Sequence, residues 1–196
     1  MFEEMHPYRD PAFKAWQQRL GELPPDAPHV RVAMPTVHDG QSMRWLQMTS
    51  ESMYIHSVSD NISTITKKIV LLAEIANYPV GFCVAAVGRY APEYLFIQRV
   101  AVDPLVRRRG AAVALLRAAV REKPDKHLAG ATLDDDAATR ALNQKLATSL
   151  GATIEVVPRR RFTPTDLSLG PGETHRPWVI DLSSTTVSEG RRMLEE

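Results

Sequence analysis

The chain has 196 residues, which is enough for one domain with short extensions and too few for two domains with full cores. Hydrophobic residues make up 44% of the sequence and charged residues 24%, a composition that excludes a globally disordered chain. Lys and Arg number 24 against 23 Asp and Glu, so the overall charge gives no reason to expect a nucleic acid or an anionic membrane as partner.

Cysteine and histidine usage narrows the class of protein further. The single cysteine, Cys83, excludes an internal disulfide framework and a Cys-rich zinc site, and it favours a reducing, cytoplasmic setting. The six histidines show no metal-ligand spacing, so we predict no metal site. No segment approaches the roughly 20 apolar residues that a membrane span needs. We therefore expect a cytoplasmic protein that binds neither a metal nor a membrane.

The chain opens with a predicted amphipathic helix over residues 11–23, which two consecutive prolines end. Three large apolar side chains recur there at helical spacing: Phe13, Trp16 and Leu20. We expect this helix to belong to an N-terminal extension, residues 1–28. Its aromatic face is expected to pack on the chain's own domain rather than on a partner subunit.

A strand and two short helices are predicted next. Residues 30–34 alternate between apolar and polar as a half-buried strand does. Thr36, with Asp39 three residues later, forms a capping arrangement for a helix that runs to about residue 53 or 54. A second, polar helix follows Asp60 and extends through Lys68.

Three apolar segments then predict an antiparallel meander: residues 69–76, 80–87 and 94–102. Turn residues separate them, and three adjacent strands form a stable sheet nucleus. The main domain is therefore expected to be built around these strands, over residues 29–184.

The second half of the chain alternates helices and strands. Residues 106–120 form the strongest predicted helix, and residues 128–133 the next strand. The acidic triplet at residues 134–136 suits the N-terminus of a helix that ends at Gly151. The last predicted strands, residues 153–157 and 178–182, are separated by a loop rich in Pro and Gly, and residues 185–196 are expected to form a tail.

The junction between the third strand of the meander and the next helix carries the clearest motif. Residues 100–104, VAVDP, end the strand, and Arg107-x-x-Gly110-x-Ala112 opens the helix. A loop that enters a helix presents unpaired main-chain N–H groups, to which a pyrophosphate can bind if small residues let it approach. Taken alone, the arginine-rich turn is explained equally well as a solvated basic turn at a helix start.

This motif, with the order of elements around it, resembles the Gln/Arg-x-x-Gly-x-Gly/Ala signature of the GNAT acyltransferase superfamily, over residues 30 to about 160. The resemblance implies an α/β (α+β) GNAT fold with a mixed central sheet of six to seven strands. The fold would have an antiparallel N-terminal meander, splayed central strands and flanking helices. The resemblance also implies direct transfer of an acetyl or other acyl group from acetyl-CoA (acyl-CoA) to a primary amine.

The resemblance also suggests where the cofactor binds. The backbone of the strand before the loop would hydrogen-bond to the pantetheine arm, and the loop would hold the pyrophosphate. The acceptor would enter the wedge between this strand and the strand at 128–133. The predicted cofactor-binding residues are Val100, Ala101, Val102, Arg107, Arg108, Arg109, Gly110, Ala111 and Ala112.

The catalytic groups are less well defined, because the sequence departs from the family pattern at two positions. Ala147 stands where relatives commonly carry a proton-donating tyrosine, and Phe96 stands where several carry a glutamate. Candidates near the expected wedge are Glu93, Gln98, His127 and Asp134. Further alternatives are Ser149 or Tyr94 as proton donor, and Glu173 or His175 from the late loop.

The acceptor is predicted to be an amine of a small molecule or a peptide. An alternative is a GNAT-like protein that binds acyl-CoA without ordinary transfer, which the missing tyrosine favours. A third is a relative that modifies nucleic acid, which would use the arginines at 107–109 and 159–161 to approach phosphates. The oligomeric state stays open, with a homodimer as one form.

Overall fold

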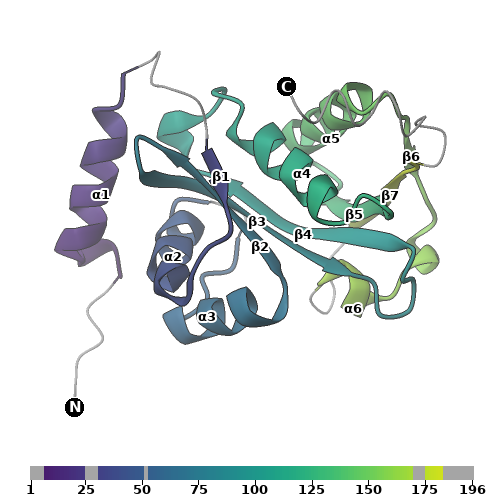
Figure 1. Ribbon diagram of the computed structural model, residues 1–196, viewed down its shortest axis with the longest axis horizontal. Helices are drawn as coiled ribbons and strands as arrows, with labels where there is room; N and C mark the ends of the chain where they lie inside the picture. Colours follow the sequence, from purple (N-terminus) through teal and green to yellow (C-terminus); the bar gives the residue numbers. More distant parts are fainter. Residues whose placement is uncertain (1–6, 25–30, 51–52, 170–174, 183–196) are drawn as a thin grey trace. The chain divides into compact units, whose positions relative to one another are not determined.

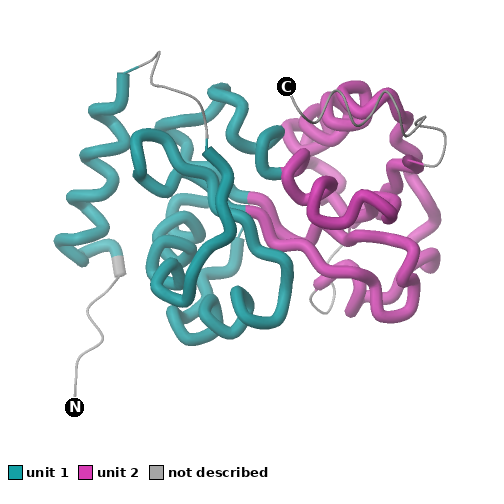
Figure 2. Tube along the Cα trace, viewed as in Figure 1, with its two compact units in different colours: residues 1–82, 101–115 teal, residues 83–100, 116–196 magenta. Residues whose placement is uncertain are grey.

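The computed structural model describes residues 7–24, 31–50, 53–169 and 175–182. The boundaries predicted at residues 28 and 184, and the tail at 185–196, lie outside these ranges. The chain divides into two compact units (Figure 2). Unit 1 comprises Met1–Phe82 and Ala101–Leu115, and unit 2 comprises Cys83–Val100 and Leu116–Glu196.

Seven strands form one mixed sheet in the order β1-β2-β3-β4-β5-β7-β6. Their bounds are β1 Arg31–Ala33, β2 Ile69–Ile75, β3 Tyr78–Val87, β4 Tyr94–Val102, β5 His127–Leu133, β6 Ile154–Val156 and β7 His175–Ile180. The pairing of β4 with β5 is parallel, whereas the β1–β2, β5–β7 and β6–β7 pairings are antiparallel. The meander predicted over residues 69–102 is confirmed, as is a seven-stranded mixed sheet.

Six α-helices connect and cover these strands (Figure 1) within the described ranges. They are α1 Pro11–Gly21, α2 Gly40–Met48, α3 Val58–Lys67, α4 Ala111–Glu122, α5 Ala137–Ser149 and α6 Pro164–Leu167. Each of the five helices predicted from periodicity is present. The four-residue α6 lies in a segment that the sequence analysis took for an irregular loop.

In unit 1, the N-terminal helix α1 packs on its own chain. Phe13 and Trp16 are buried and lie 6.5 and 5.6 Å from the ring of Trp45 in α2, measured between centroids. The indole Nε1 of Trp16 also donates a hydrogen bond to the carbonyl of Pro79 at 3.1 Å. The prediction that the aromatic face of this helix packs on its own domain is confirmed.

Helices α2 and α3 are joined by a buried amide pair. Gln47 Nε2 donates to Asn61 Oδ1 at 2.9 Å, and Asn61 Nδ2 donates to the carbonyl of Gly40 at 3.2 Å. Because each buried amide group finds a partner, the contact fixes how these two helices meet. The predicted capping box is present at a short 3-10 turn, where Thr36 and Asp39 exchange hydrogen bonds.

The helix bounds in this region differ from the prediction. Helix α2 ends at Met48 rather than near residue 53. Helix α3 begins at Val58, two residues before Asp60, because the Ser57 side chain caps it by accepting from the Asp60 N–H at 3.1 Å.

In unit 2, one face of the strands carries an aromatic core. Phe96 of β4, Ala129 of β5 and Val179 of β7 pack together with Phe162 and Leu167. The last of these belongs to α6, so α6 covers this face (Figure 1). Alternation along the strands places the odd-numbered residues of β5 and the even-numbered residues of β4 here.

The opposite face of the same strands carries a polar cluster under α5. The oxygen Oγ1 of Thr132 accepts from Trp178 Nε1 at 3.0 Å and from Asn143 Nδ2 at 3.2 Å. Asn143 belongs to α5, so α5 and α6 lie on opposite faces of this part of the sheet (Figure 1). We refer to these two sides as the α5 face and the α6 face.

Candidate functional site

The loop between β4 and α4 has a backbone shape that frees several main-chain donors. Asp103 caps a 3-10 turn, Pro104–Val106, by accepting from the Leu105 N–H at 2.9 Å. Arg108 and Gly110 then adopt left-handed conformations, with φ of +67° and +84°. These two residues interrupt the helical run, which is why α4 begins at Ala111 and not at Val106 as predicted.

The N-terminus of α4 presents a row of free N–H groups. The first intrahelical bond there runs from the Ala114 N–H to the Gly110 carbonyl at 2.9 Å. Within the part of the chain that the structure describes, no protein acceptor contacts the main-chain N–H groups of Arg108 and of residues 110–113, whereas the Arg109 N–H closes the turn at residues 107–108. A Cβ added to Gly110 would meet no atom within 4 Å, so the space around this glycine is open. Free donors and the helix dipole together favour an anion at this position.

The three arginines of the loop do not act alike. The guanidinium of Arg109 donates to the carbonyls of Pro24 at 2.7 Å and Leu23 at 3.3 Å, so it fastens the segment after α1 to the loop. Arg107 and Arg108 are exposed. The side chain of Arg109 thus has a structural role that the sequence did not reveal.

Asp103 is buried beneath this loop, and burial raises the pKa of its carboxyl group above the ordinary value of 3.8, against a smaller lowering by the Leu105 N–H. A folded-state pKa above the unfolded one means that ionisation of Asp103 opposes folding. Its contribution to stability is therefore most favourable below about pH 4 and is lost as pH rises through the raised pKa.

We expect Asp103→Asn to remove this pH dependence. Asn keeps an oxygen that can accept from the Leu105 N–H, but it carries no charge to desolvate. Urea unfolding should show the variant at least as stable as the wild type at about pH 7, with the difference shrinking toward about pH 4. A variant less stable by more than about 1 kcal/mol at about pH 7, with a smaller loss at about pH 4, would show that the charge itself stabilises the fold.

In unit 2, strands β4 and β5 pair over only part of their length and then separate. Their pairing runs from Tyr94 and His127 to Ile97 and Gly130 and stops there. β4 nevertheless continues to Val102 and β5 to Leu133. The predicted splay of the central strands is confirmed, and it opens toward the carboxyl ends of both strands. Main-chain groups beyond Ile97 on β4 are thus not used by β5.

Gln98, one of the predicted site residues, lies at the start of this splay on the α6 face. Its Nε2 donates to the carbonyl of Asp166 at 3.1 Å. Asp166 is buried, and its carboxylate accepts from the Arg89 N–H and from the Thr163 hydroxyl, both at 2.8 Å. Asp166 therefore ties the turn before β4 to α6 and holds Gln98 in position.

Asp166 was missed by the sequence analysis, although a signal was present. Thr163, Pro164 and Asp166 follow the pattern of a capped helix start, with the threonine as N-cap and the proline at the first helical position. The surrounding Pro and Gly residues obscured this pattern.

His175 also lies at the splayed end of β5. It pairs with Leu133, the last residue of that strand, and alternation places its side chain on the α6 face, as for Gln98. Its Nδ1 is buried and has no hydrogen-bond partner among the described residues. Two residues of the late loop were raised from the sequence as possible catalytic groups. His175 can accept a proton and lies at the open end of the strands, while Glu173 lies outside the described ranges.

Glu93 and His127 lie at the opposite end of these strands. His127 begins β5, its N–H donates to the Glu93 carbonyl at 3.0 Å, and it pairs with Tyr94, the first residue of β4. The four paired positions of β4 and β5 therefore separate both residues from the splay. This corrects the expectation that they face the wedge.

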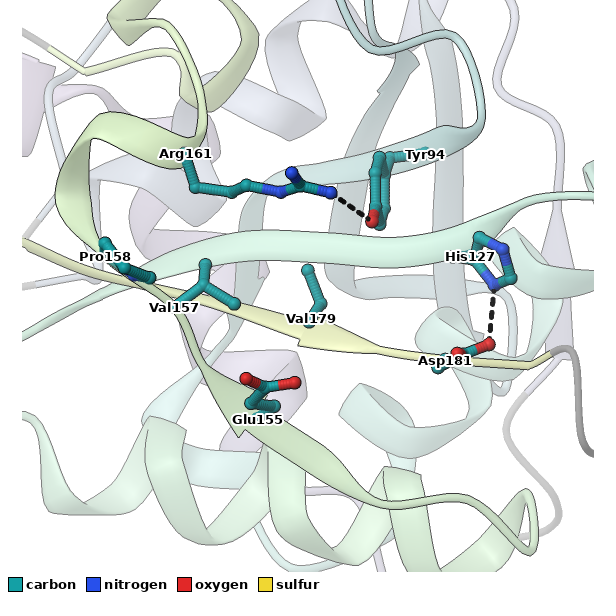
Figure 3. Close-up of a pocket in the computed structure, with 8 residues that line it drawn as sticks. All are labelled: Tyr94, His127, Glu155, Val157, Pro158, Arg161, Val179 and Asp181. Atoms are coloured by element: carbon teal, nitrogen blue, oxygen red, sulfur yellow. Dashed lines mark hydrogen bonds and ion pairs between the residues drawn. The ribbon is translucent and has the colours of Figure 1, made fainter.

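His127 instead lines a cavity of about 340 Å³ at this end (Figure 3). Its Nδ1 lies 3.1 Å from Asp181 Oδ1, and Arg161 Nη2 lies 3.3 Å from the Tyr94 hydroxyl. His127 and Asp181 are thus paired with each other and Arg161 with Tyr94, whose hydroxyl lies away from the splay as well.

The acidic triplet after β5 has structural tasks. Asp136 caps α5 by accepting from the Thr139 N–H at 2.8 Å. The carboxylate of Asp134 forms ion pairs with Arg176 at 2.7 Å and Arg159 at 3.2 Å. Both oxygens of Asp134 are therefore occupied, which makes it a weaker candidate for proton transfer than the sequence suggested.

The two positions at which the sequence departs from the family pattern are both buried. Phe96 lies in the aromatic core and Ala147 in α5, and neither side chain carries a polar group that could transfer a proton. Burial raises the pKa of the Cys83 thiol to about 12, so a thiolate nucleophile at this position is excluded at neutral pH.

None of the helices in the described residues has the length and apolarity needed to cross a bilayer. Across those same residues, no group of three or more His, Cys, Asp or Glu side chains is arranged to hold a metal ion.

A model of the acetyltransferase (GNAT) family matches residues 38–147, which is more than half of the chain. No curated protein matches at a significant level. The matched region contains the β4–α4 loop, the splayed strands and most of α5.

Several solved structures share the fold. Diaminobutyrate acetyltransferase from Paenibacillus lautus, in complex with L-2,4-diaminobutyric acid and coenzyme A, is 22% identical with a TM-score of 0.64, over 78% of this chain and 94% of that chain. Ribosomal-protein-S18-alanine N-acetyltransferase from Escherichia coli is 15% identical with a TM-score of 0.57, over 78% and 92%. A putative acetyltransferase from Salmonella typhimurium with its cofactor acetyl-CoA is 13% identical with a TM-score of 0.59, over 82% and 98%.

Identities this low establish a common fold and leave the substrate open. The family match covers the loop and the strands described above, and the solved structures share the arrangement of the sheet. The chain therefore belongs to the GNAT family of acetyltransferases.

Proposed function

We propose that this protein is an N-acyltransferase that moves an acetyl or other acyl group from acyl-CoA to a primary amine by direct attack. Family membership supports acetyl transfer in general. The observation that carries the proposal is the row of free N–H groups at Arg108 and residues 110–113, at a helix N-terminus with open space around Gly110. Such a row suits the paired phosphates of coenzyme A.

In this proposal the cofactor uses mostly main-chain groups. The N–H groups of Arg108 and of residues 110–112 bind the pyrophosphate, while the exposed Arg107 and Arg108 side chains add positive charge. Main-chain groups of β4 from Val100 to Val102 bind the pantetheine arm as an added strand would. One N–H of the same segment stabilises the oxyanion that forms when the amine attacks the thioester.

The acceptor amine must lose a proton, because an alkylammonium with a pKa of about 10 is mostly unreactive at neutral pH. We propose His175 as the proton acceptor, since its buried Nδ1 has no partner among the described residues and it stands at the open end of β5. Gln98 is an amide and cannot accept the proton, but it can orient the amine from the same face.

We expect His175→Gln to lower kcat by about 100-fold or more, the usual contribution of a general base, with little change in the KM for acetyl-CoA. The control is His38→Gln, since His38 is exposed and lies in a different unit. Steady-state rates from about pH 6 to pH 9 would check both variants. A His175 variant that keeps its rate across this range would remove the residue from the mechanism.

The acceptor class is a proposal that the structural neighbours support. Among the structural neighbours, one carries L-2,4-diaminobutyric acid as its substrate and another is named for the alanine of a ribosomal protein. We therefore propose a primary amine of a small molecule or of a polypeptide as acceptor. The fold alone does not choose between these two kinds of acceptor.

A second candidate function is an acyl-CoA-binding protein without ordinary transfer. The specific observation behind it is that Ala147 is buried in α5. The family resemblance implies that relatives commonly carry the proton-donating tyrosine at this position. Without a donor there, the departing thiolate must take its proton from water or from another group.

Two measurements separate these functions. Calorimetric titration with CoA and acetyl-CoA tests binding, and release of free thiol in the presence of an amine panel tests turnover. Binding with turnover supports the transferase, and binding without turnover on any amine or acyl donor supports the second function. Absence of binding to either nucleotide would overturn both.

A further inference from the structure

Arg99 of β4 is a charged residue whose environment in the protein is incomplete. Its Nε and Nη1 are buried, and neither has a hydrogen-bond partner among the described residues. No carboxylate within the described part of the chain forms an ion pair with it. Burial accordingly lowers the pKa of the guanidinium. Buried polar groups are nearly always paired, so an unpaired guanidinium calls for an explanation.

The position of Arg99 in the sheet supplies one. It lies two residues beyond Ile97, the last residue of β4 that pairs with β5, so it stands where the two strands have separated. Phe96 and Gln98 point to the α6 face, and alternation therefore directs Arg99 to the α5 face. Arg99 is thus on the splayed strand itself and not on a peripheral loop.

The facing wall of β5 offers a further polar group. Extending the register beyond Ile97 and Gly130 would bring Arg99 opposite Thr132, which also points to the α5 face. Thr132 accepts hydrogen bonds from Trp178 and Asn143, so its oxygen is held in place and its own hydroxyl hydrogen is left to donate. A guanidinium and a hydroxyl donor on the two walls of a splay suit a group that only accepts hydrogen bonds.

We propose that Arg99 binds a carboxylate carried by one of the two substrates of the transfer reaction, a carboxylate on the acceptor amine or on the acyl group. This inference rests on the proposed function and narrows it to anionic substrates. A carboxylate matches the planar fork of a guanidinium, and the bond strengthens where water is excluded. The cofactor's pyrophosphate is assigned to the free N–H groups of Arg108 and residues 110–113, so it does not account for Arg99.

The test compares pairs of substrates that differ only in the carboxylate. For the acceptor, diamino acids are compared with their carboxamides. For the acyl donor, succinyl-CoA is compared with butyryl-CoA. Thiol release gives kcat/KM for each member, using the wild type, Arg99→Gln and the control Arg121→Gln, which changes an exposed arginine of α4.

The wild type is expected to prefer the carboxylate-bearing member of one pair, and Arg99→Gln should reduce that preference by about 10- to 100-fold, the usual worth of a charge-assisted hydrogen bond. The pair that loses its preference identifies which substrate carries the carboxylate. The neutral member should react unchanged, and Arg121→Gln should behave as the wild type does.

Structural effects are separated by stability and cofactor binding. Removing an unpaired buried charge should leave the Tm of Arg99→Gln equal to or above that of the wild type. If that variant does not fold, Arg99→Lys keeps the charge but loses the fork, and it should reduce the preference less. The proposal for Arg99 is overturned if the wild type and a folded variant show the same preference for the carboxylate-bearing substrate, or if the wild type shows none. In either case the proposed function still stands as long as the wild type binds CoA. If the wild type does not bind CoA, the proposed function itself is overturned.

Discussion

Gly110→Glu is expected to reduce the affinity for CoA at least about 100-fold. Residue 110 lies next to the free N–H groups, and a Cβ there would meet no atom within 4 Å, so a glutamate fits and would bring a carboxylate close to the proposed pyrophosphate position. Two like charges about 4 Å apart near a protein surface repel by about 4 kcal/mol, which would abolish binding at ordinary concentrations. Isothermal titration with CoA measures the change directly.

The chain offers a matched control for this experiment. Gly151 also has a positive φ, +64°, and a Cβ there would likewise meet no atom within 4 Å. It follows α5 and not the β4–α4 loop, so Gly151→Glu carries the same added charge and a similar backbone strain away from the proposed site. Equal CoA affinity in the two variants, or unchanged affinity in Gly110→Glu, would show that the loop is not the pyrophosphate site.

Asp166→Ala should destabilise the protein by about 3 kcal/mol. The buried carboxylate accepts from the Arg89 N–H and from the Thr163 hydroxyl, and its loss leaves both donors without that partner. The cap of α6 weakens at the same time. The free energy of unfolding from urea titration measures the effect.

Two further variants test the cause of this effect. Asp166→Asn keeps one acceptor oxygen and should lose only about half as much stability. Asp135→Ala removes an exposed carboxylate and should stay within about 0.5 kcal/mol of the wild type. If Asp166→Ala unfolds at the same urea concentration as Asp135→Ala, the Asp166 network does not hold the turn before β4 to α6.

The sequence predicted local structure well wherever one pattern acted alone. The meander was evident from three apolar segments, and the β4–α4 loop from residues adjacent in the chain. Such features depend on contacts between neighbours, which periodicity and turn chemistry report. The start of α4 was misplaced because two residues in left-handed conformations, Arg108 and Gly110, break the helical pattern without a proline.

The roles of individual polar residues required the tertiary structure. From the sequence, Glu93, His127 and Gln98 were equally good candidates for the site, because all three fall at or near strands. Only the register of β4 and β5 shows that Glu93 and His127 lie at the paired end and Gln98 at the splayed end. The local pattern at Thr163 and Asp166 predicts a helix start but not the distant contact of Asp166 with Arg89. Arg109 and Arg99 carry no local signature, since the partners of Arg109, and the lack of partners for Arg99, involve segments distant in the chain.

The sequence by itself thus determined the order of the elements, the family resemblance and the position of the β4–α4 loop that we propose as the anion site, because each is encoded in residues close together along the chain. Only the tertiary structure decided which side chains reach the splay, which are engaged in ion pairs, and which guanidinium is left unpaired. The physical reason is that burial and pairing arise between strands and helices that chain folding brings together, and strand register, which a single sequence does not specify, decides which residues meet.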